Sequence, residues 1–179
     1  MKTRYLEDKE TLPLILFDTL GKENLDEFKE SIYKENHEMV FRFFIGKNQK
    51  KYKEDYRSDL TNVEERLVPN EERYHIFELS FCVYDFSFLV SILTDTLFDF
   101  NVGSHPIIYE APIHLFYENT SMYKIRFVNP VIIERNQHYN VSIKVRKEIF
   151  DINTKEIKNY KEDFKVKCML FGVTERMFG

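Results

Sequence analysis

The chain has 179 residues, of which 43% are hydrophobic and 31% are charged, and its formal net charge is −4. This length and composition are typical of one globular domain, or one domain with an appendage, that buries a core without disulfides or metal. The acidic balance argues against a protein whose main task is to coat nucleic acid, because such proteins are usually basic.

The first section, residues 1–58, is predicted to be a helix-containing arm. It begins without the apolar stretch of a signal peptide. After the apolar segment Leu12–Phe17, Asn24 is a suitable helix N-cap, and apolar residues then recur at helical spacing. We therefore predict an amphipathic helix over about Leu25–Asn36. Its apolar stripe, Leu25, Phe28 and Ile32, either packs on its own domain or reaches a neighbouring subunit.

Two short segments after this helix leave alternatives open. Met39–Ile45 is bulky and β-prone and either extends the helix or forms a strand. Lys47–Lys53 is basic, but Glu54 and Asp55 follow it directly. A solvated surface is therefore the simpler interpretation of this run, and a phosphate-contacting patch is the alternative.

The second section, residues 59–179, is predicted to be a β-sandwich. Pro69 and Asn70 mark a turn near its start, and from Arg73 onward short segments alternate apolar and polar residues. About eight strands follow with short turns between them, as expected of a sandwich or barrel. Phe86–Thr94 is apolar without strict alternation, so it is either a short helix or a bent connection.

The clearest strands of this section are Tyr139–Arg146 and Asp163–Leu170, which a polar loop joins. Each can bury one face and expose the other, as in an antiparallel sheet that is packed on one side. Pro106, Pro112 and Pro130 are expected between strands, where a missing N–H donor does no harm.

The residues that could carry chemistry do not form a recognisable catalytic pattern. The chain has no Gly-x-Ser-x-Gly motif and no phosphate-cradling glycine loop. Cys82 and Cys168 are far apart in sequence, so we expect free thiols and a reducing compartment. A metal site at His105, Glu110 and His114 is conceivable, but His105 more simply lies in a turn and His114 on the outer face of a strand.

A possible contact surface surrounds the short turn Glu118–Ser121. The bulky side chains Phe116, Tyr117, Met122 and Tyr123 flank this turn. They form either an aromatic rim that is suited to protein contact or the ordinary edge of the core.

The order of several motifs resembles the single jelly-roll structural proteins of bacterial viruses, which include capsid, penton, decoration and fibre-like proteins. The resemblance covers about residues 72–178 and leaves out the first section. The motifs that carry it are, in chain order, Phe98–Gly103, Pro112–Phe116, Ile125–Ile133, Tyr139–Ile143 and Met169–Arg176, the last with Gly172 and Arg176 at matching spacing. The segment Arg135–His138 departs from the pattern, because a glycine-containing turn is more usual there.

This resemblance implies a jelly-roll-like sandwich that works by assembly. We expect a non-enzymatic virion protein, made in the host cytoplasm, that binds itself and other virion proteins and needs no cofactor. We expect no membrane-spanning segment and no nucleic-acid partner. The alternatives are a sandwich that binds a small molecule or glycan, with or without the metal site above, and an accessory protein that binds a host factor.

Overall fold

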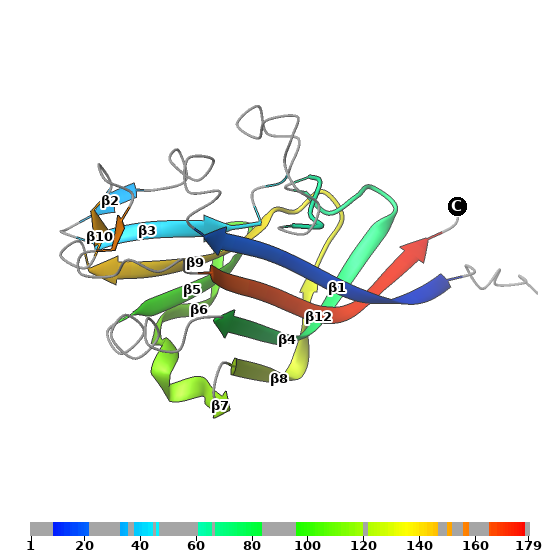
Figure 1. Cartoon of the computed structure of the whole chain (residues 1–179). Coiled ribbons are helices and arrows are strands. Elements are labelled where there is room, and N and C mark those ends of the chain that lie inside the picture. Colours follow the sequence, from blue (N-terminus) through cyan, green and yellow to red (C-terminus); the bar gives the residue numbers. More distant parts are fainter. Residues whose placement is uncertain are drawn as a thin grey trace, which may run out of the picture.

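The computed structural model describes residues 9–21, 33–35, 38–44, 46, 61–65, 67–83, 96–119, 122–146, 150–151, 156–157 and 165–177. Within these ranges the protein is mainly β, and two antiparallel sheets pack together as a sandwich (Figure 1). The helical structure of the described residues is limited to the short 3-10 turn η4 (Ile113–Phe116). No helix in these ranges is long and apolar enough to cross a membrane.

The first sheet, sheet A, has the strand order β1-β12-β4-β8-β7. Its strands are β1 (Lys9–Gly21), β12 (Lys165–Met177), β4 (Glu72–Val83), β8 (Met122–Ile133) and β7 (Tyr117–Asn119). β1 and β12 pair along their full 13 residues and lie side by side in Figure 1. β12 then pairs with β4, with a register shift at Phe171/Gly172. Gly172 is required there, because a Cβ atom would lie 1.8 Å from the carbonyl oxygen of His75.

The second sheet, sheet B, has the strand order β2-β3-β9-β5-β6. Four longer strands, β3 (Glu38–Phe43), β9 (Tyr139–Arg146), β5 (Leu97–Val102) and β6 (His105–Pro112), are flanked by the short β2 (Tyr33–Glu35). A tight turn joins β5 to β6, and in it Gly103 adopts a φ of +59°, which glycine accepts without steric cost. A separate small pair is formed by β10 (Phe150–Asp151) and β11 (Glu156–Ile157).

The core lies between the two sheets and is rich in phenylalanine. Phe81 of sheet A makes edge-on ring contacts with Phe98 and Phe43 of sheet B, at centroid distances of 5.4 and 6.3 Å. All three side chains are fully buried. Because phenylalanine buries a large area with no polar atom to satisfy, these contacts hold the sheets together.

A buried carboxyl group connects the end of β3 to β1. Asp18 is only 1% exposed, and its oxygens accept hydrogen bonds from the backbone N–H groups of Thr19, at 2.9 Å, and Phe44, at 2.8 Å. Phe44 has a φ of +65°, an unfavourable value for a residue with a side chain. The Asp18 side chain therefore stabilises the turn by which the chain leaves sheet B.

The first section differs from its predicted form. Tyr33–Glu35, the last part of the predicted helix, is strand β2, so the helix prediction is wrong there, and residues 25–32 lie outside the described residues. Pairing with β3 outweighs the helical periodicity of this segment. The open question at residues 39–45 is answered for Glu38–Phe43, which form strand β3. Both β1 and β3 of this section are integral strands of the two sheets.

The second section follows the predicted strands closely, with three differences. β9 spans Tyr139–Arg146 as predicted, while β12 is longer than expected and lies in the other sheet. Ile113–Phe116 is a 3-10 turn, so His114 does not lie on a strand. The segments on either side of Pro130, a residue expected between strands, form one strand, β8. Residues 86–94, predicted as a helix or bend, lie outside the described residues.

The prolines expected between strands lie inside them instead. Pro106 and Pro112 belong to β6, and Pro130 belongs to β8. β6 is an edge strand, and Pro130 falls in the irregular stretch where β8 loses register with β4. Edges and bulges are the two places where a sheet tolerates a residue without an N–H donor.

Candidate functional site

The predicted aromatic rim is divided between core and surface. Phe116 is half-buried and packs edge-on against Phe98 of the core, with a centroid distance of 5.7 Å. Tyr123 is buried, Met122 is half-buried, and Tyr117 alone of the four residues is exposed. Tyr117 also packs on the ring of Tyr123. The four predicted rim residues therefore include both core-edge and exposed positions. The other predicted contact residues, Leu25, Phe28 and Ile32, lie outside the described residues.

His105, Glu110 and His114, which were considered as metal ligands, do not form a metal site in the structure. The carboxylate of Glu110 contacts the ammonium group of Lys144, at 3.0 Å. His105 is exposed at the start of β6 and His114 is exposed on η4. Among the described residues, no group of three or more His, Cys, Asp or Glu side chains could hold a metal ion.

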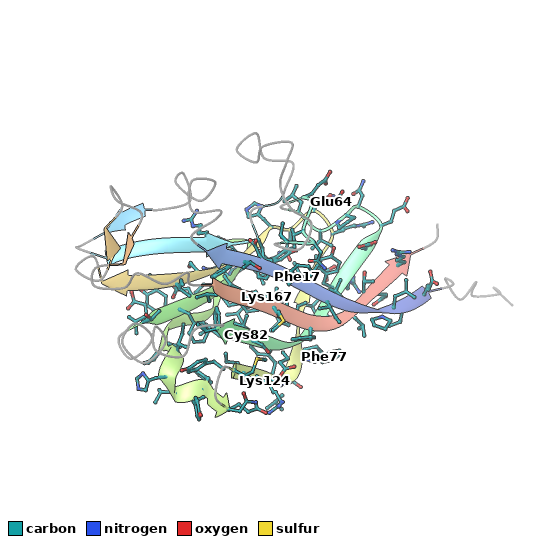
Figure 2. The ribbon with its side chains drawn as sticks, in the orientation of Figure 1. Phe17, Glu64, Phe77, Cys82, Lys124 and Lys167 are labelled. Carbon is teal, nitrogen blue, oxygen red and sulfur yellow. The ribbon has the colours of Figure 1, made fainter. Side chains whose placement is uncertain are left out.

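The outer face of sheet A carries a group of apolar side chains that spans four neighbouring strands. We call this group the apolar patch; it consists of Pro13 and Ile15 on β1, Phe171 and Val173 on β12, Phe77 on β4 and Ile132 on β8. Ile15, Phe77 and Ile132 are 55, 44 and 46% exposed. Figure 2 shows Phe77 on this sheet beside β8. Single exposed apolar residues are ordinary, whereas a large contiguous group of them is typical of an interaction site. On β4 two polar residues interrupt this group, because His75 lies between Val173 and Ile132 and Glu78 lies beside Phe171.

Charged side chains border the apolar patch at both of its ends. At one end, Arg126 contacts Glu78 and Glu118, and Lys124 and Lys167 lie on the same face (Figure 2). At the other end, Arg73 contacts Glu134, at 2.8 Å, and Glu175 contacts His75, at 3.0 Å. His75 itself lies within the patch, between Val173 and Ile132. An apolar centre with a polar rim is the usual anatomy of a protein–protein interface.

The outer face of sheet B has the opposite character and holds a polar pocket of about 530 Å³. Adjacent strands β3, β9 and β5 supply most of its lining, and the β5–β6 turn closes one end. The lining residues are Val40, Arg42, Asp99, Asn101, Gly103, Ser104, His138, Asn140, Ser142 and Lys144. A pocket of this volume is within the usual range for small-molecule sites.

Alternation along the strands builds this polar pocket. On β9, Tyr139, Val141 and Ile143 point into the core, so Asn140, Ser142 and Lys144 point outward. On β5, the buried Phe98 and Phe100 leave Asp99 and Asn101 outward in the same way. Pairing of Asp99 with Ser142 and of Asn101 with Asn140 places these polar side chains next to one another.

Lys144 is held by two carboxylates at one end of the pocket. Its ammonium group lies 3.3 Å from Asp99 and 3.0 Å from Glu110, and Asp99 also accepts a 2.6 Å hydrogen bond from the backbone N–H of Glu110. Burial acts to lower the pKa of Lys144, but its contacts with Glu110 and Asp99 raise that pKa above its usual value. The hydrogen bond from Lys144 in turn lowers the pKa of Glu110. This end of the pocket therefore holds one cation between two carboxylates, with a formal excess of one negative charge.

Neither the apolar patch nor the polar pocket was found from the sequence. The alternation of β5 and β9 assigns Asp99, Asn101, Asn140 and Ser142 to one outward face, and that signal was available. The neighbouring positions of β5 and β9 depend on sheet order, which alternation does not specify.

Comparison with known protein families gives no match, and comparison with curated proteins finds no relative of the chain.

Proposed function

We propose that this protein is a non-enzymatic structural subunit of a virion, that it has a jelly-roll fold, and that it works by assembling with further copies of itself. The apolar patch on sheet A is the observation that carries this proposal. In the proposed assembly, the patch is the contact surface between copies.

The strand order supports the jelly-roll part of the proposal. The eight long strands are, in chain order, β1, β3, β4, β5, β6, β8, β9 and β12. The first of these pairs with the last, the second with the seventh, the third with the sixth and the fourth with the fifth. A long hairpin rolled into two sheets gives this nested pairing, which is characteristic of jelly rolls such as those of viral capsids and lectins.

The fold alone does not fix a function, so the argument for assembly comes from the surface. The apolar patch extends across all four long strands of sheet A, and its side chains stand on a rigid sheet that needs no ordering on contact. Burying such side chains is favourable by about 25 cal/mol per Å² of apolar surface removed from water. The resemblance of residues 72–178 to virion jelly rolls supports a second copy, or another virion protein, as the partner.

The charges at the two ends of the patch favour a second copy of this chain. One end has three cations, Lys124, Arg126 and Lys167, against two carboxylates, Glu78 and Glu118. The other end has one arginine, Arg73, against two carboxylates, Glu134 and Glu175. A two-fold axis that lies in the interface, perpendicular to the strands, would place the positive end of one copy against the negative end of the other, which gives a self-complementary interface.

A matched pair of isoleucine substitutions tests the proposal. Ile132 lies in the apolar patch and is 46% exposed, whereas Ile107 lies on β6 of the other sheet and is 41% exposed. We expect the full chain to be oligomeric by multi-angle light scattering. We expect Ile132→Glu to lower its mass to that of the monomer and Ile107→Glu to leave the mass unchanged.

Both variants should keep the far-ultraviolet circular dichroism spectrum of the parent protein, because both changes are at partly exposed positions. A parent protein that remains monomeric over a wide concentration range would rule out self-assembly. Equal effects of the two substitutions would rule out the apolar patch as the contact.

A further inference from the structure

We propose that the polar pocket on the outer face of sheet B is a binding site for an uncharged sugar, of the size of a mono- or disaccharide. This site lies on the sheet opposite to the apolar patch and does not depend on assembly.

The pocket is built to hold a polar ligand. Its lining contains one bulky apolar side chain, Val40, and otherwise amide, hydroxyl, imidazole and charged groups with two small turn residues. Asn101 and Asn140 face each other with a long contact of 3.5 Å between the Nδ2 and Oδ1 atoms. Side-chain amides both donate and accept hydrogen bonds, as sugar hydroxyl groups do.

The charges in the pocket argue against an ionic ligand. Lys144 is bound by Asp99 and Glu110, so an added phosphate would compete with two carboxylates for this cation. Arg42, the other permanent cation of the lining, also has an interaction partner in the protein. A metal ion would in turn have to displace Lys144 from the same two carboxylates. An uncharged ligand with many hydroxyl groups avoids both costs and can use the fixed donors and acceptors as they stand.

An exposed aromatic ring lies beside Lys144, next to the lining of the pocket. Tyr109 is 70% exposed, and the ammonium group of Lys144 lies 5.6 Å from the centre of its ring. Glu110, the next residue, has a φ of +46°, and a bulge between β5 and β6 occurs at this point. Bulges redirect side chains, and the result here is a ring beside a polar pocket. A sugar has an apolar C–H face and a polar edge, and this combination of ring and amides fits both.

The test uses the full chain on an array of uncharged and charged glycans, followed by calorimetric titration with any uncharged sugar that binds. We expect Asn140→Ala to weaken binding about tenfold, as the loss of one good hydrogen bond does. Tyr109→Ala should weaken binding to a similar extent, and Tyr109→Phe should not, because the ring face is kept. Asn119→Ala is the matched control, since Asn119 is exposed on β7 of the other sheet.

Four outcomes would overturn the inference. These are no binding to any uncharged glycan, equal binding of inorganic phosphate alone, a requirement for Ca²⁺, and binding that Asn140→Ala and Tyr109→Ala leave unchanged. Thermal unfolding of each variant separates lost binding from lost folding. The patch variant Ile132→Glu should bind the sugar as well as the parent does, so a failure of self-assembly would not affect this result.

Discussion

The buried carboxyl group of Asp18 makes the stability of the protein depend on pH in an unusual direction. Burial raises the pKa of Asp18 from 3.8 to about 7, against the opposing effect of the hydrogen bonds from Phe44 and Thr19. The folded protein therefore keeps a proton on Asp18 between about pH 4 and pH 7, where the unfolded chain has released it. Since the folded state then binds more protons than the unfolded state, the free energy of unfolding falls as the pH rises through this window.

The size of the effect follows from the two pKa values of Asp18. Each pKa unit corresponds to about 1.4 kcal/mol, so this group lowers the free energy of unfolding by about 3 kcal/mol between pH 4.5 and pH 8. Above pH 8 its contribution is constant. The more familiar behaviour of a paired surface carboxylate, which stabilises the folded state as the pH rises, has the opposite sign.

Urea unfolding of the parent protein and of Asp18→Asn, measured at intervals from pH 4.5 to pH 8, tests this reasoning. The asparagine side chain cannot ionise, so the difference between the two proteins isolates the contribution of Asp18 from that of every other titrating group. We expect the stability of the parent protein relative to the variant to fall by about 3 kcal/mol over this range. A difference that stays constant with pH would show that Asp18 titrates normally.

Two further predictions concern backbone packing and thiol access. Gly172→Ala should destabilise the protein by about 1–3 kcal/mol in urea unfolding, because its Cβ atom would overlap the backbone of His75. A loss as small as a few tenths of a kcal/mol would mean that β12 and β4 separate easily. Cys168 is fully buried, and burial raises the pKa of its thiol, so a thiol reagent should label the half-buried Cys82 first and Cys168 only after unfolding. Rapid labelling of both cysteines in the folded protein would contradict this burial.

Strand positions were predictable where alternation was strict, and sheet membership was not. β9 has the predicted limits, and along its described side chains Tyr139, Val141 and Ile143 face the core while the polar residues between them face outward. The strand predicted at Asp163–Leu170 shows the same alternation but pairs with β1 and β4, while β9 pairs with β3 and β5. Alternation specifies which face is buried and contains no information about the neighbouring strand, which depends on long-range packing.

The same limit explains what could be predicted of the two candidate surfaces. Asn140 and Asp99 were each predictable as outward residues of a strand, but their convergence in one pocket requires β9 and β5 to be neighbours. Phe77 fits the alternation of its strand as an apolar residue, and it is exposed because β4 and β8 lose register beside it. A bulge is a local irregularity of pairing, so the periodicity of a single strand does not reveal it.

The position of β12 has a consequence for how the protein is made. β12 follows every other strand of the two sheets along the chain, yet it lies inside sheet A, between β1 and β4. While residues 165–177 are still within the ribosome, β1 has no partner strand in sheet A, and β4 has an unpaired edge. Unpaired edges promote aggregation, and pairing of strands so distant in sequence is slow. Sheet A is thus completed only after β12 has left the ribosome, and release of a chain that lacks β12 would leave two open edges.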